Sequence, residues 1–230
     1  MTPHRIILWD IDGTLLHSGG AGEKAIQRAA RALYGRELAL HELDYRGRTD
    51  SLIVRQIFSL FEIPWSEENV ARFRETYLAY LEEEIARSSG HVFPGVERML
   101  ATIEGNPEWQ QGLLTGNFER GARIKLDRFG LGRFFSFGAF GDGRECRNEV
   151  ARAALELLRR RWGEELSAER LFLIGDTPHD VLCAQAIGAY SIAVATGGYS
   201  LSELAGYRPT LLLPDLEQLE PALALLQGLS

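Results

Sequence analysis

Two short apolar runs, one near each end of the chain and each followed directly by aspartates, constrain the fold more than any other feature of the sequence. Residues 6–9 (IILW) precede DIDGT at 10–14, and residues 171–174 (LFLI) precede GDTPHD at 175–180. Short apolar runs that end at glycine and polar residues are typical of buried strands in an open α/β sheet. Because such sheets bind ligands at the carboxyl ends of their strands, we expect these aspartates to line a functional site.

The rest of the chain divides into an α/β part and a helical part. Four more apolar runs predict strands at 111–115, 136–140, 191–195 and 210–213. Strands that alternate with helices are typical of a doubly wound parallel sheet. Between 16 and 91, by contrast, apolar residues recur only at helical spacing. We therefore expect an α/β core built from residues 1–15 and 92–230, with a helical insertion at 16–91.

The composition of the chain limits which binding partners and which cellular compartment we expect. The 230 residues carry a formal net charge of −7, which argues against nucleic acid or an anionic membrane surface as a partner. No apolar run reaches the roughly 18 residues of a membrane span, and the sequence opens directly on a strand instead of a signal peptide. Cys146 and Cys183 form no CxxC or Cys/His cluster and fit a reducing compartment. We therefore expect a cytoplasmic protein.

The aspartates of the first strand end have a spacing that suits chemistry. Asp10 and Asp12 extend from the same side of the chain, close enough to share a cation or to divide the roles of nucleophile and acid/base. A third strand end supplies Thr115, Gly116 and Asn117, and backbone N–H groups at a helix N-terminus bind anions. A polar turn is the alternative for the first pair alone. Three polar strand ends in this order favour a site for an anion and a cation.

The motifs DxDGT, TGN and GDxxxD together resemble those of the haloacid dehalogenase (HAD) superfamily, in particular its phosphoglycolate phosphatase-like branch. The resemblance extends from residue 6 to residue 213. It implies a Rossmann-type core with the strand of residues 6–9 in the middle of the sheet, and an α-helical cap of the C1 type at 16–91. It also implies a Mg²⁺-dependent phosphatase that hydrolyses a small phosphomonoester, such as phosphoglycolate or a sugar phosphate, through an aspartyl-phosphate.

The same resemblance assigns roles to the motif residues. Asp10 is the nucleophile, and Asp12 is the acid/base provided that its surroundings raise its pKa. The implied Mg²⁺ ligands are the Asp10 side chain, the Asp12 backbone carbonyl, Asp176 and Asp180, the last directly or through water. For Asp180, a carboxylate at a helix N-terminus is the alternative. The implied phosphate-binding groups are the Thr115 hydroxyl with the nearby amides of Gly116 and Asn117.

The third motif of the family departs from its usual form. Where relatives place a lysine at the start of a helix, this chain has Arg147. Arginine is always charged and could neutralise Asp10 and phosphate, although it is longer and planar. Lys125 is the rival, since its side chain should lean back towards the N-terminus of its helix, where phosphate is expected. The sequence leaves the choice between these two cations open.

The insertion offers one candidate for substrate contact. In YRGRTD at 45–50, Arg46 and Arg48 could grip a carboxylate or a second phosphate. The alternative is a solvated loop in which Thr49 or Asp50 caps the next helix.

Other activities remain in competition with the phosphatase. A dehalogenase is disfavoured, because relatives with that activity usually lack the second aspartate, here Asp12. A phosphosugar mutase of the β-phosphoglucomutase type uses the same aspartate pair and stays open. A non-catalytic protein that binds a phosphorylated metabolite is a further alternative. We expect a monomer or homodimer that binds a small phosphorylated metabolite, and neither nucleic acid nor a membrane.

Overall fold

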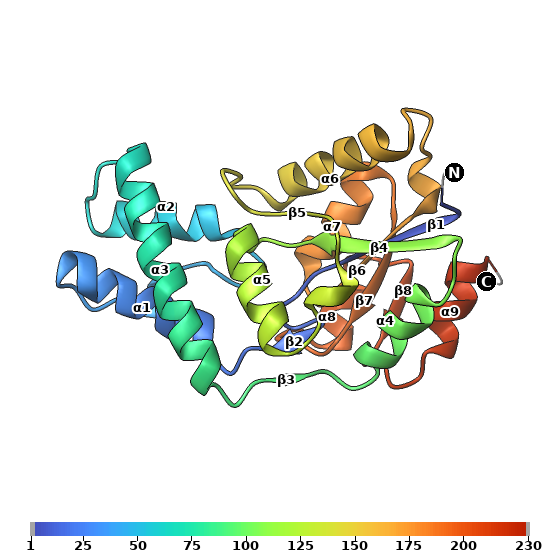
Figure 1. The fold of residues 1–230 in the computed structure, drawn as a ribbon, viewed down its shortest axis with the longest axis horizontal. Helices are drawn as coiled ribbons and strands as arrows, with labels where there is room; N and C mark the ends of the chain where they lie inside the picture. The colour runs from blue at the N-terminus through green and yellow to red at the C-terminus, as the bar shows by residue number, and fades with distance from the viewer. Residues whose placement is uncertain (1–2, 229–230) are drawn as a thin grey trace.

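The computed structural model describes residues 3–228 and is built around a six-stranded parallel sheet. Its strands lie in the order β5-β4-β1-β6-β7-β8, so that β1 is central (Figure 1). The strands are β1 (Arg5–Trp9), β4 (Trp109–Leu114), β5 (Gly138–Ala139), β6 (Leu171–Gly175), β7 (Tyr190–Val194) and β8 (Leu211–Leu213). The doubly wound α/β fold predicted from the sequence is therefore confirmed.

The helices lie on both faces of this sheet. The helices of the α/β part are α4 (Val96–Glu104), α5 (Glu119–Arg128), α6 (Arg147–Trp162), α7 (Pro178–Ile187), α8 (Leu201–Ala205) and α9 (Glu220–Gln227). Figure 1 shows α6 and α7 above the sheet and α4 and α9 below it. Short 3₁₀ helices occur at η1 (Leu40–Glu42), η2 (Gly132–Phe134) and η3 (Ala168–Arg170).

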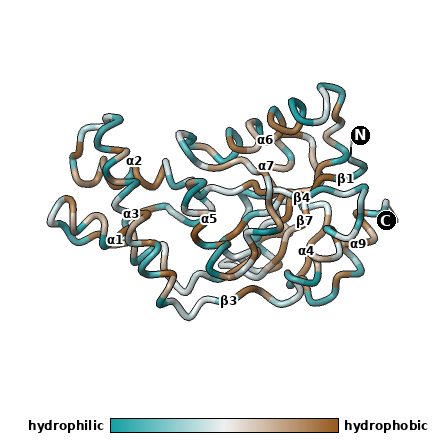
Figure 2. The backbone as a smooth tube through the Cα atoms, viewed as in Figure 1, coloured by the Kyte–Doolittle hydropathy of each residue, from teal (hydrophilic) through white to brown (hydrophobic). Residues whose placement is uncertain are grey.

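The side chains of the central strand β1 pack against the helices on both faces of the sheet. Successive side chains of a strand point to opposite faces. Accordingly, Ile7 and Trp9 pack in one apolar cluster with α4 and α9, while Ile6 and Leu8 pack in another with α6 and α7. Both faces of β1 are buried, which is why its sequence is continuously apolar. Hydrophobic segments accordingly concentrate on the strands and on the inner sides of the helices (Figure 2).

The helical part has an apolar core of its own. It contains α1 (Ala21–Tyr34), α2 (Asp50–Leu60) and α3 (Glu67–Arg87), and a cluster that includes Phe58, Phe73 and Leu81 holds them together. Two chain segments join it to the sheet, and they pair as the antiparallel strands β2 (Leu16–His17) and β3 (His91–Val92). We name residues 16–91 the helical cap. The division of the chain into two domains at these boundaries stays a prediction.

One strand is shorter than its sequence predicts. The run at 136–140 forms a strand only at Gly138–Ala139. This strand lies at the edge of the sheet and pairs only with β4. Its flanking Phe137 and Phe140 are instead buried in two different apolar clusters. Within residues 3–228, no helix has both the length and the apolar character needed to cross a membrane.

Candidate active site

Three neighbouring strands bring the sequence motifs to one edge of the sheet. Asp10 follows β1, Thr115 follows β4 and Asp176 follows β6. Since β4 and β6 pair in parallel with β1 on either side, the three residues meet at the carboxyl ends of the strands. A cavity of about 410 Å³ opens there between the sheet and the helical cap, and it is lined by residues of both. This volume falls in the range of small-molecule sites.

Arg147 is the cation that contacts Asp10. It begins α6, and its Nη1 lies 3.2 Å from Asp10 Oδ1, while its Nη2 donates to Asp180 Oδ1. All three side chains are at least nine-tenths buried. Burial raises the pKa of Asp10 to about 6, because the nearby Asp180 adds to the desolvation and Arg147 offsets only part of it.

Lys125 contacts the other aspartate of the pair. Its Nζ lies 2.5 Å from Asp12 Oδ2 and 2.5 Å from Asn117 Oδ1, so the side chain leans back towards the start of α5. Burial opposes ionisation of Asp12, but the Lys125 charge and the hydrogen bonds from Lys125 and Asn117 outweigh it and lower the pKa of Asp12. The condition that the surroundings of Asp12 raise its pKa is therefore not met in this structure. The two candidate cations therefore contact different aspartates: Arg147 contacts Asp10, and Lys125 contacts Asp12.

The loop after β4 is shaped by tight contacts. The buried Thr115 hydroxyl accepts a hydrogen bond from Asn117 Nδ2 at 3.0 Å and also bonds Asp10. Asn117 Nδ2 reaches Asp12 Oδ2 at 3.0 Å as well. A Cβ added to Gly116 would lie 2.3 Å from the carbonyl oxygen of Arg48, so glycine is required for this close approach. Asn117 therefore links the phosphate-binding candidates to the acid/base candidate.

Three carboxylates form the candidate metal centre. One ligand oxygen from each of Asp10, Asp176 and Asp180 lies within 4.8 Å of the others. The Thr14 hydroxyl donates to Asp176 at 2.9 Å, yet burial and the charges of Asp10 and Asp180 still raise the pKa of Asp176 well above its usual range. Mg²⁺ prefers oxygen ligands of this kind. A buried carboxylate without a cationic partner among residues 3–228 fits such an ion.

Two glycines leave room for the Asp176 carboxylate. A Cβ on Gly13 would lie 2.3 Å from Asp176 Oδ2, and a Cβ on Gly197 would lie 1.8 Å from the same atom. Gly13 also has a φ of 84°, in the region that favours glycine. The glycine of DxDGT is therefore part of the acidic site as well as a turn residue.

Asp180 caps α7 and also belongs to the acidic cluster, while its role as a metal ligand stays a prediction. Its Oδ2 accepts from the backbone N–H of Thr177 at 3.0 Å and from the Thr177 hydroxyl at 2.7 Å, in a capping box at the start of α7. Its Oδ1 accepts from Arg147 and lies close to Asp10 and Asp176. The capping of α7 and the place in the acidic cluster, which the sequence offered as alternatives for Asp180, therefore occur together.

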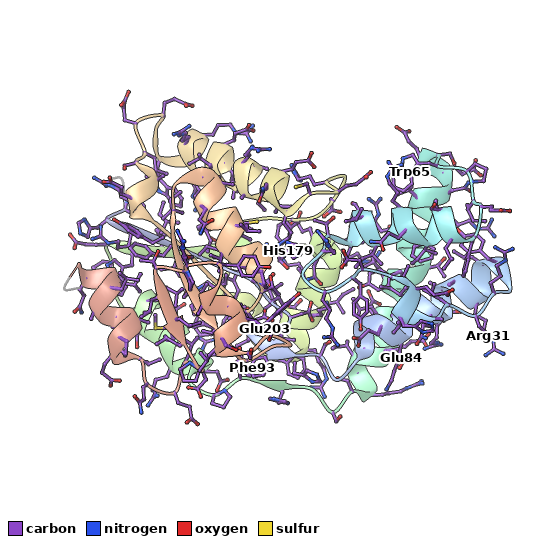
Figure 3. All side chains as sticks on the ribbon, turned by 180° about the vertical axis from the view of Figure 1, so that it is seen from behind. Arg31, Trp65, Glu84, Phe93, His179 and Glu203 are labelled. Carbon is purple, nitrogen blue, oxygen red and sulfur yellow. The ribbon has the colours of Figure 1, made fainter. Side chains whose placement is uncertain are left out.

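The cap loop reaches the cavity, but its two arginines differ. Both line the cavity, yet Arg48 is ion-paired with Asp44, while Arg46 is exposed and has no polar partner among residues 3–228. The loop touches the core at Gly47, where a Cβ would lie 2.9 Å from the His179 ring. Figure 3 shows His179 where the core meets the cap, whereas Arg31 lies at the far end of the cap. Of the two residues proposed as helix cap, Thr49 is the one, accepting from the Leu52 N–H at 3.2 Å.

Two cavity residues, Asp50 and Tyr77, were not assigned a role at the site by the sequence analysis. Asp50 accepts from the backbone N–H of Phe118 at 2.8 Å, and burial raises its pKa to about 6, with the Lys125 charge opposing the rise. Tyr77 is only 2% exposed, but it lines the cavity. Asp50 follows a helix cap and Tyr77 sits in an apolar helical stripe, so each had an ordinary structural explanation.

Comparison with known proteins decides the family. The family model described as haloacid dehalogenase-like hydrolase matches residues 7–185. The chain belongs to this family. The HAD-like chain is 29% identical over 217 residues to a phosphoglycolate phosphatase of Vibrio cholerae, covering 92% of this chain and 93% of that protein. It is 30% identical over 223 residues to phosphoglycolate phosphatase 1 of Pseudomonas aeruginosa, covering 94% and 79% respectively.

A solved structure shows the same fold. The crystal structure of a predicted phosphoglycolate phosphatase from Haemophilus somnus has a TM-score of 0.73 and 16% identity, covering 97% of this chain and 99% of that one. The resemblance inferred from the three motifs is therefore confirmed, and the chain is a HAD-like hydrolase of the phosphatase type.

Proposed function

We propose that this HAD-like hydrolase is a Mg²⁺-dependent phosphatase that acts on small phosphomonoesters of the phosphoglycolate or sugar phosphate type. The observation that carries the proposal is the separate pairing of the two DxDGT aspartates. Asp10 contacts Arg147 and Asp12 contacts Lys125, and all four side chains line one cavity. Two carboxylates held in different electrostatic environments suit the two roles that the reaction needs.

In the first half of the reaction, the Asp10 carboxylate attacks phosphorus. An aspartyl-phosphate forms, the bond from phosphorus to the leaving oxygen breaks, and Asp12 supplies the proton to that oxygen. The Thr115 hydroxyl and the Arg147 guanidinium flank Asp10, where negative charge develops on the phosphoryl oxygens. The charge of a bound phosphate next to Asp12 favours its protonated form for this step.

In the second half, water attacks the phosphorus of the aspartyl-phosphate. Asp12 accepts a proton from the water, the bond between Asp10 and phosphorus breaks, and inorganic phosphate leaves. An ionised Asp12 is the form required here, and its lowered pKa keeps that form available. Lys125 and Asn117 hold the carboxylate in place, since both contact Asp12 Oδ2.

Asp10, Asp176 and the Asp12 backbone carbonyl would hold Mg²⁺, with Asp180 next to them, directly or through water. When bound, the ion offsets negative charge on the phosphate and on the carboxylates. The raised pKa of Asp176 supports this assignment, because it reflects uncompensated carboxylate charge at the site.

The substrate side is formed by the cap. Arg46 is the better placed of the two cap arginines for a second anionic group, since Arg48 is already paired with Asp44. Gly116 and Asn117 supply amides near the phosphate. We infer a cytoplasmic monomer or homodimer whose partner is a small phosphorylated metabolite, without nucleic acid or membrane; the free thiols of Cys146 and Cys183 agree with that compartment.

The test is a panel of phosphorylated metabolites assayed for phosphate release with Mg²⁺, alongside Asp10→Asn. Release that depends on both Mg²⁺ and Asp10 supports the proposal, and activity that persists in Asp10→Asn contradicts the nucleophile assignment. Incubation with glucose 1-phosphate separates the mutase alternative, which would give an isomer instead of phosphate. Binding without any turnover across the panel would favour a non-catalytic metabolite-binding protein.

A further inference from the structure

The helical cap contributes polar groups to the cavity wall, and Tyr77 is the most informative of them. Tyr77 comes from α3 and is 2% exposed, and its ring contacts that of Phe118 edge-on with 6.4 Å between centroids. Its hydroxyl has no hydrogen-bond partner in residues 3–228, although the residue lines the cavity. A buried phenol usually finds such a partner. The hydroxyl is therefore available to a ligand.

Asp50 stands beside Tyr77 on the same wall. Its Oδ2 is fixed by the Phe118 N–H at 2.8 Å, and its own N–H donates to the carbonyl oxygen of Gly116 at 2.8 Å. Both residues contact Phe118, Asp50 through the Phe118 backbone N–H and Tyr77 through the Phe118 ring, and both line the cavity together with Lys125. Asp50 Oδ1 has no partner among the described residues and can accept a hydrogen bond. The backbone contacts make this acceptor rigid.

Gly22 leaves space in front of these groups. It lies in α1 and lines the cavity, and a Cβ placed on it would be 3.9 Å from both Lys125 Nζ and the Tyr77 hydroxyl oxygen. Lys125 spends two of its three N–H donors on Asp12 and Asn117. The third donor and the phenol thus border a space that no side chain fills, in the cavity that Asp50 also lines.

We propose that Tyr77, Asp50 and Lys125 form a subsite that binds hydroxyl groups of the leaving group, so that the preferred substrates are phosphorylated polyols or sugars and not phosphorylated carboxylic acids. The inference rests on the phosphatase function proposed above and specifies its substrate class. A hydroxyl can donate to Asp50 and accept from Tyr77 or Lys125 at the same time. The apolar Ile26 and Ile53 line the same cavity and can contact the carbon chain.

Charge separates the two substrate classes at this subsite. A substrate carboxylate would meet the ionisable Asp50 and Asp12, against the single charge of Lys125, which Asp12 already pairs. Like charges repel in a partly buried site, whereas a neutral hydroxyl avoids that cost. Arg46 is not part of this subsite: it lies towards Gly198 on the loop after β7, where a Cβ would be 3.5 Å from its guanidinium, so an anionic group bound by Arg46 does not occupy the space beside Tyr77.

The test compares glycerol 3-phosphate with 2-phosphoglycolate, using p-nitrophenyl phosphate as the reference substrate. The full-length enzyme with Mg²⁺ should have the higher kcat/KM for glycerol 3-phosphate. Tyr77→Phe removes only the hydroxyl and should lower kcat/KM for glycerol 3-phosphate about three- to ten-fold relative to the reference, the loss of one hydrogen bond. A preference for 2-phosphoglycolate, or an unchanged ratio in Tyr77→Phe, would overturn the subsite.

Two further variants guard against a folding artefact. Gly22→Ala inserts a methyl group into the space and should lower kcat/KM for glycerol 3-phosphate without destabilising α1, since alanine is the better helix former. Tyr80→Phe, on the same helix but outside the cavity, is the matched control and should not change the substrate ratio. A Tyr80→Phe effect equal to that of Tyr77→Phe would contradict the subsite.

A binding measurement separates the failure of this inference from the failure of the phosphatase proposal. Calorimetric titration of Asp10→Asn with glycerol 3-phosphate needs no turnover. Weaker binding in Asp10→Asn/Tyr77→Phe supports the subsite even if no substrate is hydrolysed. Equal binding, with p-nitrophenyl phosphate hydrolysed by the wild type, overturns the subsite and leaves the phosphatase standing.

Discussion

Replacing Arg147 with methionine should destabilise the protein strongly at neutral pH and much less in acid. The guanidinium is 6% exposed and pairs with Asp10 and Asp180, which are 5% and 2% exposed. Removing it leaves these two buried carboxylates without the cation that they share. Asp10 lies 137 residues and Asp180 33 residues from Arg147 in the sequence. Breaking a buried ion pair from one side costs about 3–5 kcal/mol. The expected loss is of that size at pH 8.

The pH dependence follows from the carboxylates. The folded-state pKa of Asp10 already stands at about 6 with Arg147 opposing the rise, so it rises further when Arg147 is removed. The folded variant then binds more protons than the unfolded chain, so its stability increases as the pH falls through this range. At pH 5 the loss in free energy of unfolding relative to the wild type should be less than half of its value at pH 8.

Urea unfolding of wild type and Arg147→Met at pH 5 and pH 8, in EDTA, measures both values. EDTA is essential, because a bound cation would replace part of the lost charge. The double variant Arg147→Met/Asp180→Asn is the matched control and should recover part of the stability at pH 8. A loss below about 1 kcal/mol, or an equal loss at both pH values, would refute the reasoning.

Three further predictions concern neighbouring side chains. Asp50→Asn should stabilise the protein by about 1–3 kcal/mol at pH 7.5 and little at pH 4, because the raised pKa of Asp50 makes its ionisation oppose folding as the pH rises towards 6; equal urea midpoints for variant and wild type at pH 7.5 would count against it. Gly13→Ala should push against Asp176 and raise the Mg²⁺ concentration for half-maximal activity about ten-fold or more, so an unchanged Mg²⁺ titration would contradict that site. Lys125→Met should slow phosphate release about 10²-fold. It should also move the acidic limb of the pH–rate profile to higher pH, because the pKa of Asp12 rises without the Lys125 charge. A stopped assay across pH measures the limb, and an unchanged limb would contradict this prediction.

The sheet and its polar edge were predictable because their signals are local. A strand buried on both faces is apolar at every position, and the turn after it carries glycine and polar residues. The local structure of residues 6–14 and 171–180 can therefore be predicted from these residues alone. The carboxyl ends of parallel neighbours meet, which brings Asp10, Thr115 and Asp176 together without further information.

The partners of the two aspartates were not predictable, since they depend on the reach of side chains across the fold. Arg147 begins α6 and Lys125 lies in the last turn of α5, and only the packing of these two helices decides that each cation contacts a different aspartate. Tyr77 followed the apolar pattern of α3 and therefore looked like a core residue. Its position is indeed buried, and only the cavity shows that its hydroxyl has a free side.

The nucleophile is tested most directly by mass spectrometry of the enzyme stopped with acid during turnover. With Mg²⁺ and a hydrolysed substrate, the account predicts that the peptide carrying Asp10 gains the mass of one phosphoryl group, and that fragmentation places the group on Asp10. Arg5 and Lys24 bound a tryptic peptide of convenient size around it. Asp10→Asn should show no such gain. Phosphate release with no modified peptide under these conditions, or with the group on another residue, would contradict the account.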